Sequence, residues 1–357
     1  MSFEIPVLAQ QICFMTRRAS NMHIISTSRG FVGKDLISCE EWTLEELETV
    51  FDLAKDLKRK FKTGEPHELL KNKTFFMIFY ATSTRTRNSF EAALTQLGGH
   101  AHFLETKTLR MGDRGAPEAI KDTVKVLERY GHGIGVRVYT PSYGEGEQIV
   151  REYAKWASIP VISMESDVEH PCQALADMLT VKEKLPKYEG KKYVQAWGYS
   201  PNALRVPAVP QSNIMMMARY GMDVVYVRPP EFGLDPRVVQ KTKENAKESG
   251  GSFRETDNLK EAFEGAHVVY MRNHTTLNYG DISAKVEQTL IDKYKDWTCN
   301  DSLMDLTDKK SIFMHCLPAD RGYEVTNEVF DGPHSAVYDE AENRLHVQKA
   351  IMALVMR

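Results

Sequence analysis

Short apolar runs, each followed by a polar turn and a segment with helical spacing, recur along the chain and limit what it can fold into. The clearest run is Thr74–Tyr80 (TFFMIFY), which leads directly into ATSTRTRNSFEAALTQLGG and ends at Gly98-Gly99. A run that is apolar on both faces is typical of a strand that helices cover on both sides. The sequence therefore predicts an α/β fold with parallel sheets and crossover helices.

The alternation falls into two series, which indicates two domains. Pro186 and Gly190 interrupt it, and 357 residues exceed the usual size of one hydrophobic core, at roughly 150 residues per domain. The expected parts are an N-terminal extension (1–34), a first domain (35–185), a second domain (186–338) and a C-terminal helix (339–357) that either stays with the second domain or returns to the first. Further strands are predicted at 134–138, 161–163, 192–197, 223–227, 267–270 and 311–314, with helices at 148–157 and 171–184.

Composition excludes several classes of partner. Lys and Arg total 46 against 49 Asp and Glu, so there is no basic field for a nucleic acid and any anion site must be local. No apolar run reaches the roughly 18 residues of a membrane span, and the N-terminus lacks the order of a secretory signal. We expect a cytoplasmic protein with an undocked N-terminal extension, no metal ion and no cofactor. Its five scattered cysteines form no CxxC pair and fit free thiols: Cys13, Cys39, Cys172, Cys299 and Cys316.

The segment Ser83-Thr84-Arg85-Thr86-Arg87 lies where the buried strand turns into a helix. Backbone N–H groups, hydroxyls and a guanidinium can converge there on one anion beside the positive end of the helix. A capped helix with two arginines facing solvent gives the same pattern. The segment is thus a candidate phosphate cradle, and both interpretations stay open on this motif alone.

Two further motifs follow predicted strands. His170-Pro171-Cys172-Gln173 begins a helix, where an imidazole and an amide can polarise a carbonyl, although a lone histidine is more often a satisfied, partly buried residue. His315-Cys316-Leu317-Pro318 lies at the carboxyl edge of the second sheet, where ligands gather. Its thiol is either a nucleophile or, more commonly, a packing residue.

Four motifs together resemble the aspartate/ornithine carbamoyltransferase (transcarbamylase) family. They are STRTR (83–87), HPCQ (170–173), HCLP (315–318) and DEAENRL (339–345), in the family's order and approximate spacing. The resemblance extends from about Asp35 to the C-terminus. It implies two Rossmann-like domains, homotrimeric assembly, and transfer of the carbamoyl group of carbamoyl phosphate to an amine with release of phosphate.

The resemblance also assigns residues. Arg85, Arg137 and His170 are the expected catalytic residues, because an activated carbonyl needs charge stabilisation on its oxygen and on the leaving phosphate more than it needs a covalent nucleophile. The acceptor is expected to meet Glu165, Arg272 and Cys316. Carbamoyl phosphate is expected to bind Ser83, Thr84, Arg85, Thr86, Arg137, His170, Gln173, Cys316, Leu317 and Arg344, with Arg87 in a supporting position and Arg110, from the stretch LRMG (109–112), reaching in from a neighbouring subunit.

The identity of the acceptor depends on the second domain. Ordinary ornithine enzymes of the family carry an Asp and an SMG triplet where this chain has VYMRNH (269–274), which argues against plain ornithine. The proline-rich segment Trp197–Pro210 resembles the loop of the knotted subgroup, which includes N-acetylornithine and N-succinylornithine enzymes and others with unassigned acceptors. Arg272 aligns with an acceptor-binding lysine of those enzymes, whereas Glu324 stands where acetylornithine enzymes have a lysine.

We therefore expect an ornithine-like or N-acylated diamino-acid acceptor, with plain ornithine and putrescine as alternatives. A nucleotide-binding dehydrogenase or a phosphate-binding receptor is the alternative of another class, because alternating strands and helices suit those as well. No GxGxxG motif follows a predicted strand, which argues against the dehydrogenase.

Overall fold

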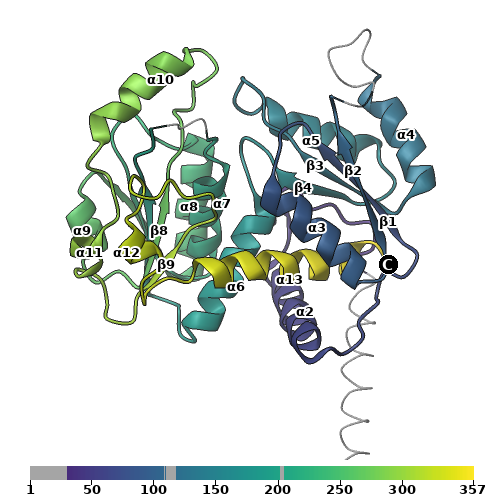
Figure 1. The fold of residues 1–357 in the computed structure, drawn as a ribbon, viewed down its shortest axis with the longest axis horizontal. Coiled ribbons are helices and arrows are strands. Elements are labelled where there is room, and N and C mark those ends of the chain that lie inside the picture. The colour runs from purple at the N-terminus through teal and green to yellow at the C-terminus, as the bar shows by residue number, and fades with distance from the viewer. Residues whose placement is uncertain (1–29, 108, 110–117, 202–204) are drawn as a thin grey trace, which may run out of the picture.

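A computed structural model describes residues 30–107, 109, 118–201 and 205–357 (Figure 1). Three predicted features lie outside the described residues: the N-terminal extension up to residue 29, Arg110, and residues 202–204 of the proline-rich loop. Because part of that loop is not described, the knot stays a prediction. Across the described ranges, none of the helices is long and apolar enough to span a membrane.

The chain forms two parallel sheets, each covered by helices (Figure 1). The first series of elements is α2 (Leu44–Thr63), β1 (Thr74–Phe79), α3 (Thr84–Gln96), β2 (His100–Glu105), α4 (Ile120–Tyr130), β3 (Gly133–Arg137), α5 (Glu145–Trp156), β4 (Val161–Glu165) and α6 (Pro171–Lys184). The second is β5 (Lys192–Trp197), α7 (Ala208–Arg219), β6 (Asp223–Val227), α8 (Pro236–Ser249), β7 (Ser252–Thr256), α9 (Leu259–Phe263), β8 (Val268–Arg272), α10 (Ala284–Ile291), α11 (Asp301–Met304), β9 (Ile312–Met314), α12 (Asn327–Phe330) and α13 (Val337–Val355). The predicted α/β class with parallel sheets in two domains is confirmed.

Strand order determines where a ligand can bind. The first sheet runs β2-β1-β3-β4 and the second β7-β6-β5-β8-β9, with every pairing parallel. The chain reverses its direction of travel across each sheet between β1 and β3 and between β5 and β8. Such switch points open a crevice at the carboxyl ends of the strands. The segments that follow β1, β3 and β8 therefore face ligand-binding space.

The central strands are apolar and buried, as predicted, whereas two edge strands were not predicted. Every residue of the central strands β3 and β8 is buried, and so is every residue of β4, although β4 lies at one edge of the first sheet. The edge strands β2 (HAHFLE) and β7 (SFRET) keep several side chains exposed or half-buried. Because a half-exposed edge strand does not form an apolar run, the pattern that predicted the central strands has no signal for these two.

Helices α6 and α13 join the two domains. Helix α6 packs against α7 of the second domain, and α13 packs against α2, α3 and α6 while it also contacts β9. Figure 1 shows α13 leaving the second domain and ending beside the first. The C-terminal segment thus returns to the first domain, and it brings the DEAENRL motif to the space between the two sheets.

Candidate active site

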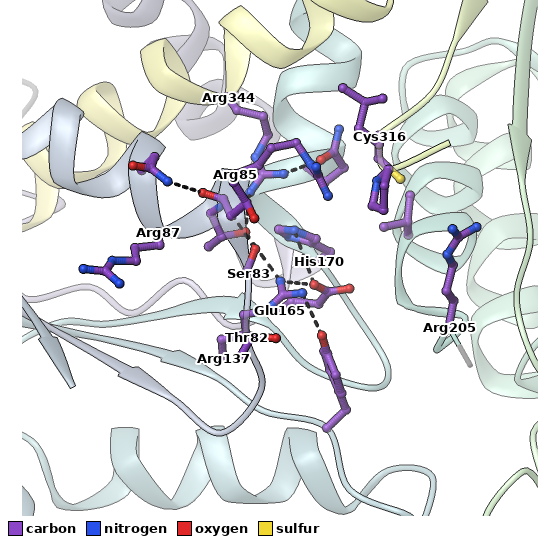
Figure 2. A pocket seen from close by; sticks show the side chains of 18 of the residues that line it. Thr82, Ser83, Arg85, Arg87, Arg137, Glu165, His170, Arg205, Cys316 and Arg344 are labelled. Carbon is purple, nitrogen blue, oxygen red and sulfur yellow. Dashed lines mark hydrogen bonds and ion pairs between the residues drawn. The ribbon is translucent and has the colours of Figure 1, made fainter. Parts of the chain in front are cut away.

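A cavity of about 800 Å³ lies between the two domains, at the carboxyl ends of the strands (Figure 2). Its lining comes from the ends of β3, β4 and β8, the first turns of α3 and α6, and the turn after β9, with Arg344 from α13. The structure places all of the described predicted site residues around this one cavity: Ser83, Thr84, Arg85, Thr86, Arg137, Glu165, His170, Gln173, Arg272, Cys316, Leu317 and Arg344.

The turn between β1 and α3 forms one wall. Ser83 is the N-cap of α3, and its hydroxyl accepts a hydrogen bond from the backbone N–H of Thr86 at 3.3 Å. The Thr86 hydroxyl accepts from Arg137 Nη1 at 3.4 Å and from Arg344 Nη2 at 3.2 Å. The positive end of a 13-residue helix and two guanidinium groups therefore meet at one hydroxyl, which is the geometry of an anion site.

Six arginines line the cavity. They form two groups: arginines paired with a carboxylate and arginines without such a partner. Three form ion pairs within 4 Å: Arg87 with Glu91, Arg137 with Glu165, and Arg205 with Asp320 and Glu324. The other three, Arg85, Arg272 and Arg344, have no such partner anywhere in the described parts of the chain. Three unneutralised guanidiniums in one partly closed space favour a ligand with more than one negative charge.

Electrostatics determine the protonation state of His170 at the start of α6. Burial, followed by repulsion from Arg344, Arg137 and other cavity arginines, holds its pKa well below the ordinary value. Its backbone N–H donates to the Ser212 hydroxyl at 2.8 Å, and its Nε2 lies 3.8 Å from Glu165. A neutral imidazole has one N–H, so His170 can donate one hydrogen bond to a carbonyl oxygen without adding charge.

The turn after β9 supplies the opposite wall. Burial raises the pKa of the Cys316 thiol, although Arg272 opposes the shift, so the thiol stays protonated and is a poor nucleophile. Leu317 adopts a left-handed φ of 59°, and its N–H donates to His315 Nδ1 at 2.9 Å. Arg272 Nη1 donates to the Pro318 carbonyl at 3.2 Å. This turn therefore contributes fixed backbone geometry to the cavity.

Sequence reasoning missed several side chains that hold the predicted ones. The Tyr139 hydroxyl accepts from Arg137 Nη2 at 2.7 Å, and Arg205 lines the cavity from the proline-rich segment. Buried Glu324 accepts from Arg205 at 2.9 Å and from the N–H of Asn273 at 2.7 Å. Arg205 had a signal, as a cation in a segment already singled out, and Glu324 was noted for its place against a family lysine but not as the partner of Arg205. The partners of the others depend on tertiary contacts.

The fold and the cavity are those of a two-domain α/β enzyme with a cationic cavity between its domains. Residues 34–183 match the family described as "Aspartate/ornithine carbamoyltransferase, carbamoyl-P binding domain", and residues 207–355 match "Aspartate/ornithine carbamoyltransferase, Asp/Orn binding domain". The chain belongs to the aspartate/ornithine carbamoyltransferase family and is a carbamoyltransferase. This match decides against the dehydrogenase alternative.

Similar proteins include both ornithine and acetylornithine enzymes. The ornithine carbamoyltransferase of Halalkalibacterium halodurans is 41% identical over 324 residues, which are 91% of this chain and 95% of that protein. The solved ornithine carbamoyltransferase of Pyrococcus furiosus has a TM-score of 0.80 at 39% identity, covering 91% of this chain and 98% of its own. An acetylornithine transcarbamylase solved with acetylcitrulline has a TM-score of 0.83 at 35% identity, covering 91% and 99%.

The protonated thiol generates a first prediction. Because Cys316 is expected to supply geometry and no nucleophile, Cys316→Ser should retain turnover within about tenfold of the wild type. Intact-mass spectrometry of the wild-type enzyme during turnover should show no carbamoyl adduct. A trapped covalent adduct on Cys316 would contradict this assignment.

The neutral imidazole generates a second prediction. A histidine whose pKa is depressed stays neutral as the pH falls from about 8 to about 6, so it adds no positive charge beside a bound anion over that range. The change in carbamoyl phosphate affinity between the two pH values, measured by calorimetry, should agree within about twofold for the wild type and His170→Asn. A gain in affinity at the lower pH that is confined to the wild type would mean that His170 becomes protonated.

Proposed function

We propose that the enzyme transfers the carbamoyl group of carbamoyl phosphate to the side-chain amine of an amino-acid acceptor whose α-nitrogen is acylated, and releases phosphate. The observation that carries the proposal is the distribution of charge around the cavity. Unneutralised guanidiniums face the donor side, and the acceptor side offers a single unneutralised cation, Arg272, with no lining carboxylate from the second domain among the described residues.

The donor would bind at the turn between β1 and α3. Its phosphate carries up to two negative charges, which Arg85, Arg137 and Arg344 would face, and it would lie beside the first turn of α3. Arg137 and the neutral imidazole of His170 would stabilise the carbonyl oxygen as negative charge develops on it during attack by the amine. In this arrangement the nucleophile is the acceptor amine, which forms the new C–N bond as the bond to phosphate breaks.

The acceptor would bind against the second domain. An α-carboxylate matches Arg272, which donates to the Pro318 carbonyl and forms no ion pair within 4 Å among the described residues. A free α-ammonium group would need a carboxylate, and the three acidic side chains that line the cavity all come from the first domain: Glu91, Glu105 and Glu165. Glu165 already pairs with Arg137. Acylation removes the ammonium charge and with it this mismatch.

Direct assay tests the proposal. With carbamoyl phosphate as donor, kcat/KM for N-acetylornithine or N-succinylornithine, measured by phosphate release, should exceed that for ornithine and putrescine by about tenfold or more. Arg85→Ala should lower kcat/KM by about a hundredfold or more, whereas Arg254→Ala, at an exposed arginine on β7, should not change it. Preference for ornithine or putrescine would overturn the acyl specificity and leave the donor site standing.

We also propose a cytoplasmic homotrimer in which Arg110 completes the active site of a neighbouring subunit, as the family resemblance implies. Mixing subunits tests it. Arg110→Ala and Arg85→Ala chains, each nearly inactive alone, should recover part of the activity when refolded together, because some interfaces then pair an intact cavity with an intact Arg110. Mixed trimers that show only the activity of the parents, with mixing confirmed by native mass spectrometry, would place Arg110 elsewhere.

A further inference from the structure

Two buried carboxyl groups lie directly behind Gln173, and neither belongs to the predicted site. Asp177 lies one turn along α6 and Glu340 lies on α13; neither is more than 1% exposed. The Nε2 group of Gln173 donates to Asp177 Oδ1 at 2.6 Å and to Glu340 Oε1 at 2.9 Å. Both carboxyls thus act on the nitrogen end of one amide that lines the cavity.

These contacts determine which way the Gln173 amide faces. An amide has a donor end and an acceptor end, and its orientation follows from its partners. With the nitrogen held by two carboxyls, the oxygen Oε1 accepts a hydrogen bond from Arg344 Nη1. The reversed amide would set its oxygen against two carboxyl oxygens and its N–H₂ group against a guanidinium. The contact with Arg344, which can only donate, would be repulsive, and one shared proton on the carboxyl pair could satisfy at most one of the two contacts there, so Arg344 and the carboxyls together select one orientation.

Glu340 also ties the amide to the second domain. Its Oε1 accepts from the Tyr270 hydroxyl at 3.0 Å, and its Oε2 accepts from the backbone N–H of His315 at 2.8 Å. Tyr270 lies on β8 and His315 begins the turn after β9. One carboxyl therefore connects the amide on α6 with the turn that holds Cys316.

The pair is tolerated in the interior because it retains a proton near neutral pH. Burial raises the pKa of Asp177 to about 6, and burial together with repulsion from Asp177 raises the pKa of Glu340 well above its ordinary value. No ion pair of either residue is found in the described chain. Two carboxyls that share one proton can lie side by side and still accept hydrogen bonds.

We propose that Asp177 and Glu340 are positioning residues: the pair holds the oxygen of the Gln173 amide toward Arg344 and the cavity, so that the donor site is pre-organised before carbamoyl phosphate arrives. The inference rests on the proposed donor site. Neither carboxyl touches the substrate; both act through Gln173, and Glu340 acts also through the backbone of His315.

Binding of carbamoyl phosphate alone, without acceptor, tests the pair through a double-mutant cycle. Both oxygens of Glu340 accept hydrogen bonds, so the N–H₂ group of Glu340→Gln meets a donor on whichever side it lies and, unlike a carboxyl, cannot pass a proton to Asp177. Calorimetry should therefore show affinity about tenfold weaker, or about 1.4 kcal/mol. In a Gln173→Ala background the same change should weaken binding clearly less, because the part of its effect that passes through the amide is then absent and only the part through the His315 backbone remains. Asp339→Asn, at the preceding residue, which pairs with Lys184 at 2.7 Å, is the matched control and should bind as the wild type does.

Two results would contradict the proposed role of the carboxyl pair. One is a folded Glu340→Gln protein with wild-type affinity; the other is losses of binding free energy from Glu340→Gln and Gln173→Ala that simply add in the double variant. Circular dichroism and the unfolding midpoint establish folding. If Glu340→Gln does not fold, Asp177→Asn enters the same cycle with the same two decisive outcomes. A wild-type protein that binds no carbamoyl phosphate overturns the proposed donor site and this inference with it, whereas failure of the variants alone to behave as stated leaves the donor site intact.

Discussion

Electrostatic repulsion among the cavity arginines is the constraint that the other groups of the site must offset. Like charges in a partly desolvated space destabilise one another, and here burial and then neighbouring guanidiniums lower the pKa of Arg85. The surrounding groups limit that cost without removing it: Glu165 pairs with Arg137, while the oxygens of Thr86 and Gln173 accept from Arg344. The residual positive charge is a pre-organised field, which an anionic substrate in the proposed donor site would neutralise.

The proposed donor site combines residues from both ends of the chain, and this links it to the packing of the two domains. The hydrogen bond between Thr86 and Arg344 spans 258 residues, and Arg344 reaches α3 because α13 returns to pack on the first domain. The same helix brings Glu340 to Gln173 on α6. The first domain therefore contains most residues of the proposed donor site, and α13, which follows the second domain in the chain, adds Arg344.

The sequence predicted those features of the fold that local residue patterns determine. Central strands such as Thr74–Phe79 are apolar throughout, and their carboxyl ends carry the motifs, so the position of the cavity followed from the sequence. The resemblance to a family then assigned individual residues that physical reasoning had left open, including Arg344. Half-exposed edge strands gave no such signal. Nor did the sequence indicate a role for the Asp177 carboxyl. Its partner carboxyl, Glu340, lies 167 residues from Gln173, and only the tertiary fold brings Glu340 and Gln173 together.

Glu324 carries a negative charge where the resemblance to acetylornithine enzymes implies a lysine. This difference changes the balance of charges near the proposed acceptor site. Although burial opposes ionisation, His315 and then Arg205 lower the pKa of Glu324, so this carboxylate is ionised behind the wall. It accepts from Arg205 at 2.9 Å, which fixes that guanidinium at the edge of the cavity. A lysine at this position would repel Arg205. Glu324 instead neutralises the charge of Arg205. Glu324 is thereby paired and does not line the cavity, so in the proposed acceptor site Arg272 would be the main electrostatic partner. That balance favours an acceptor that presents a carboxylate and a neutral acylated nitrogen.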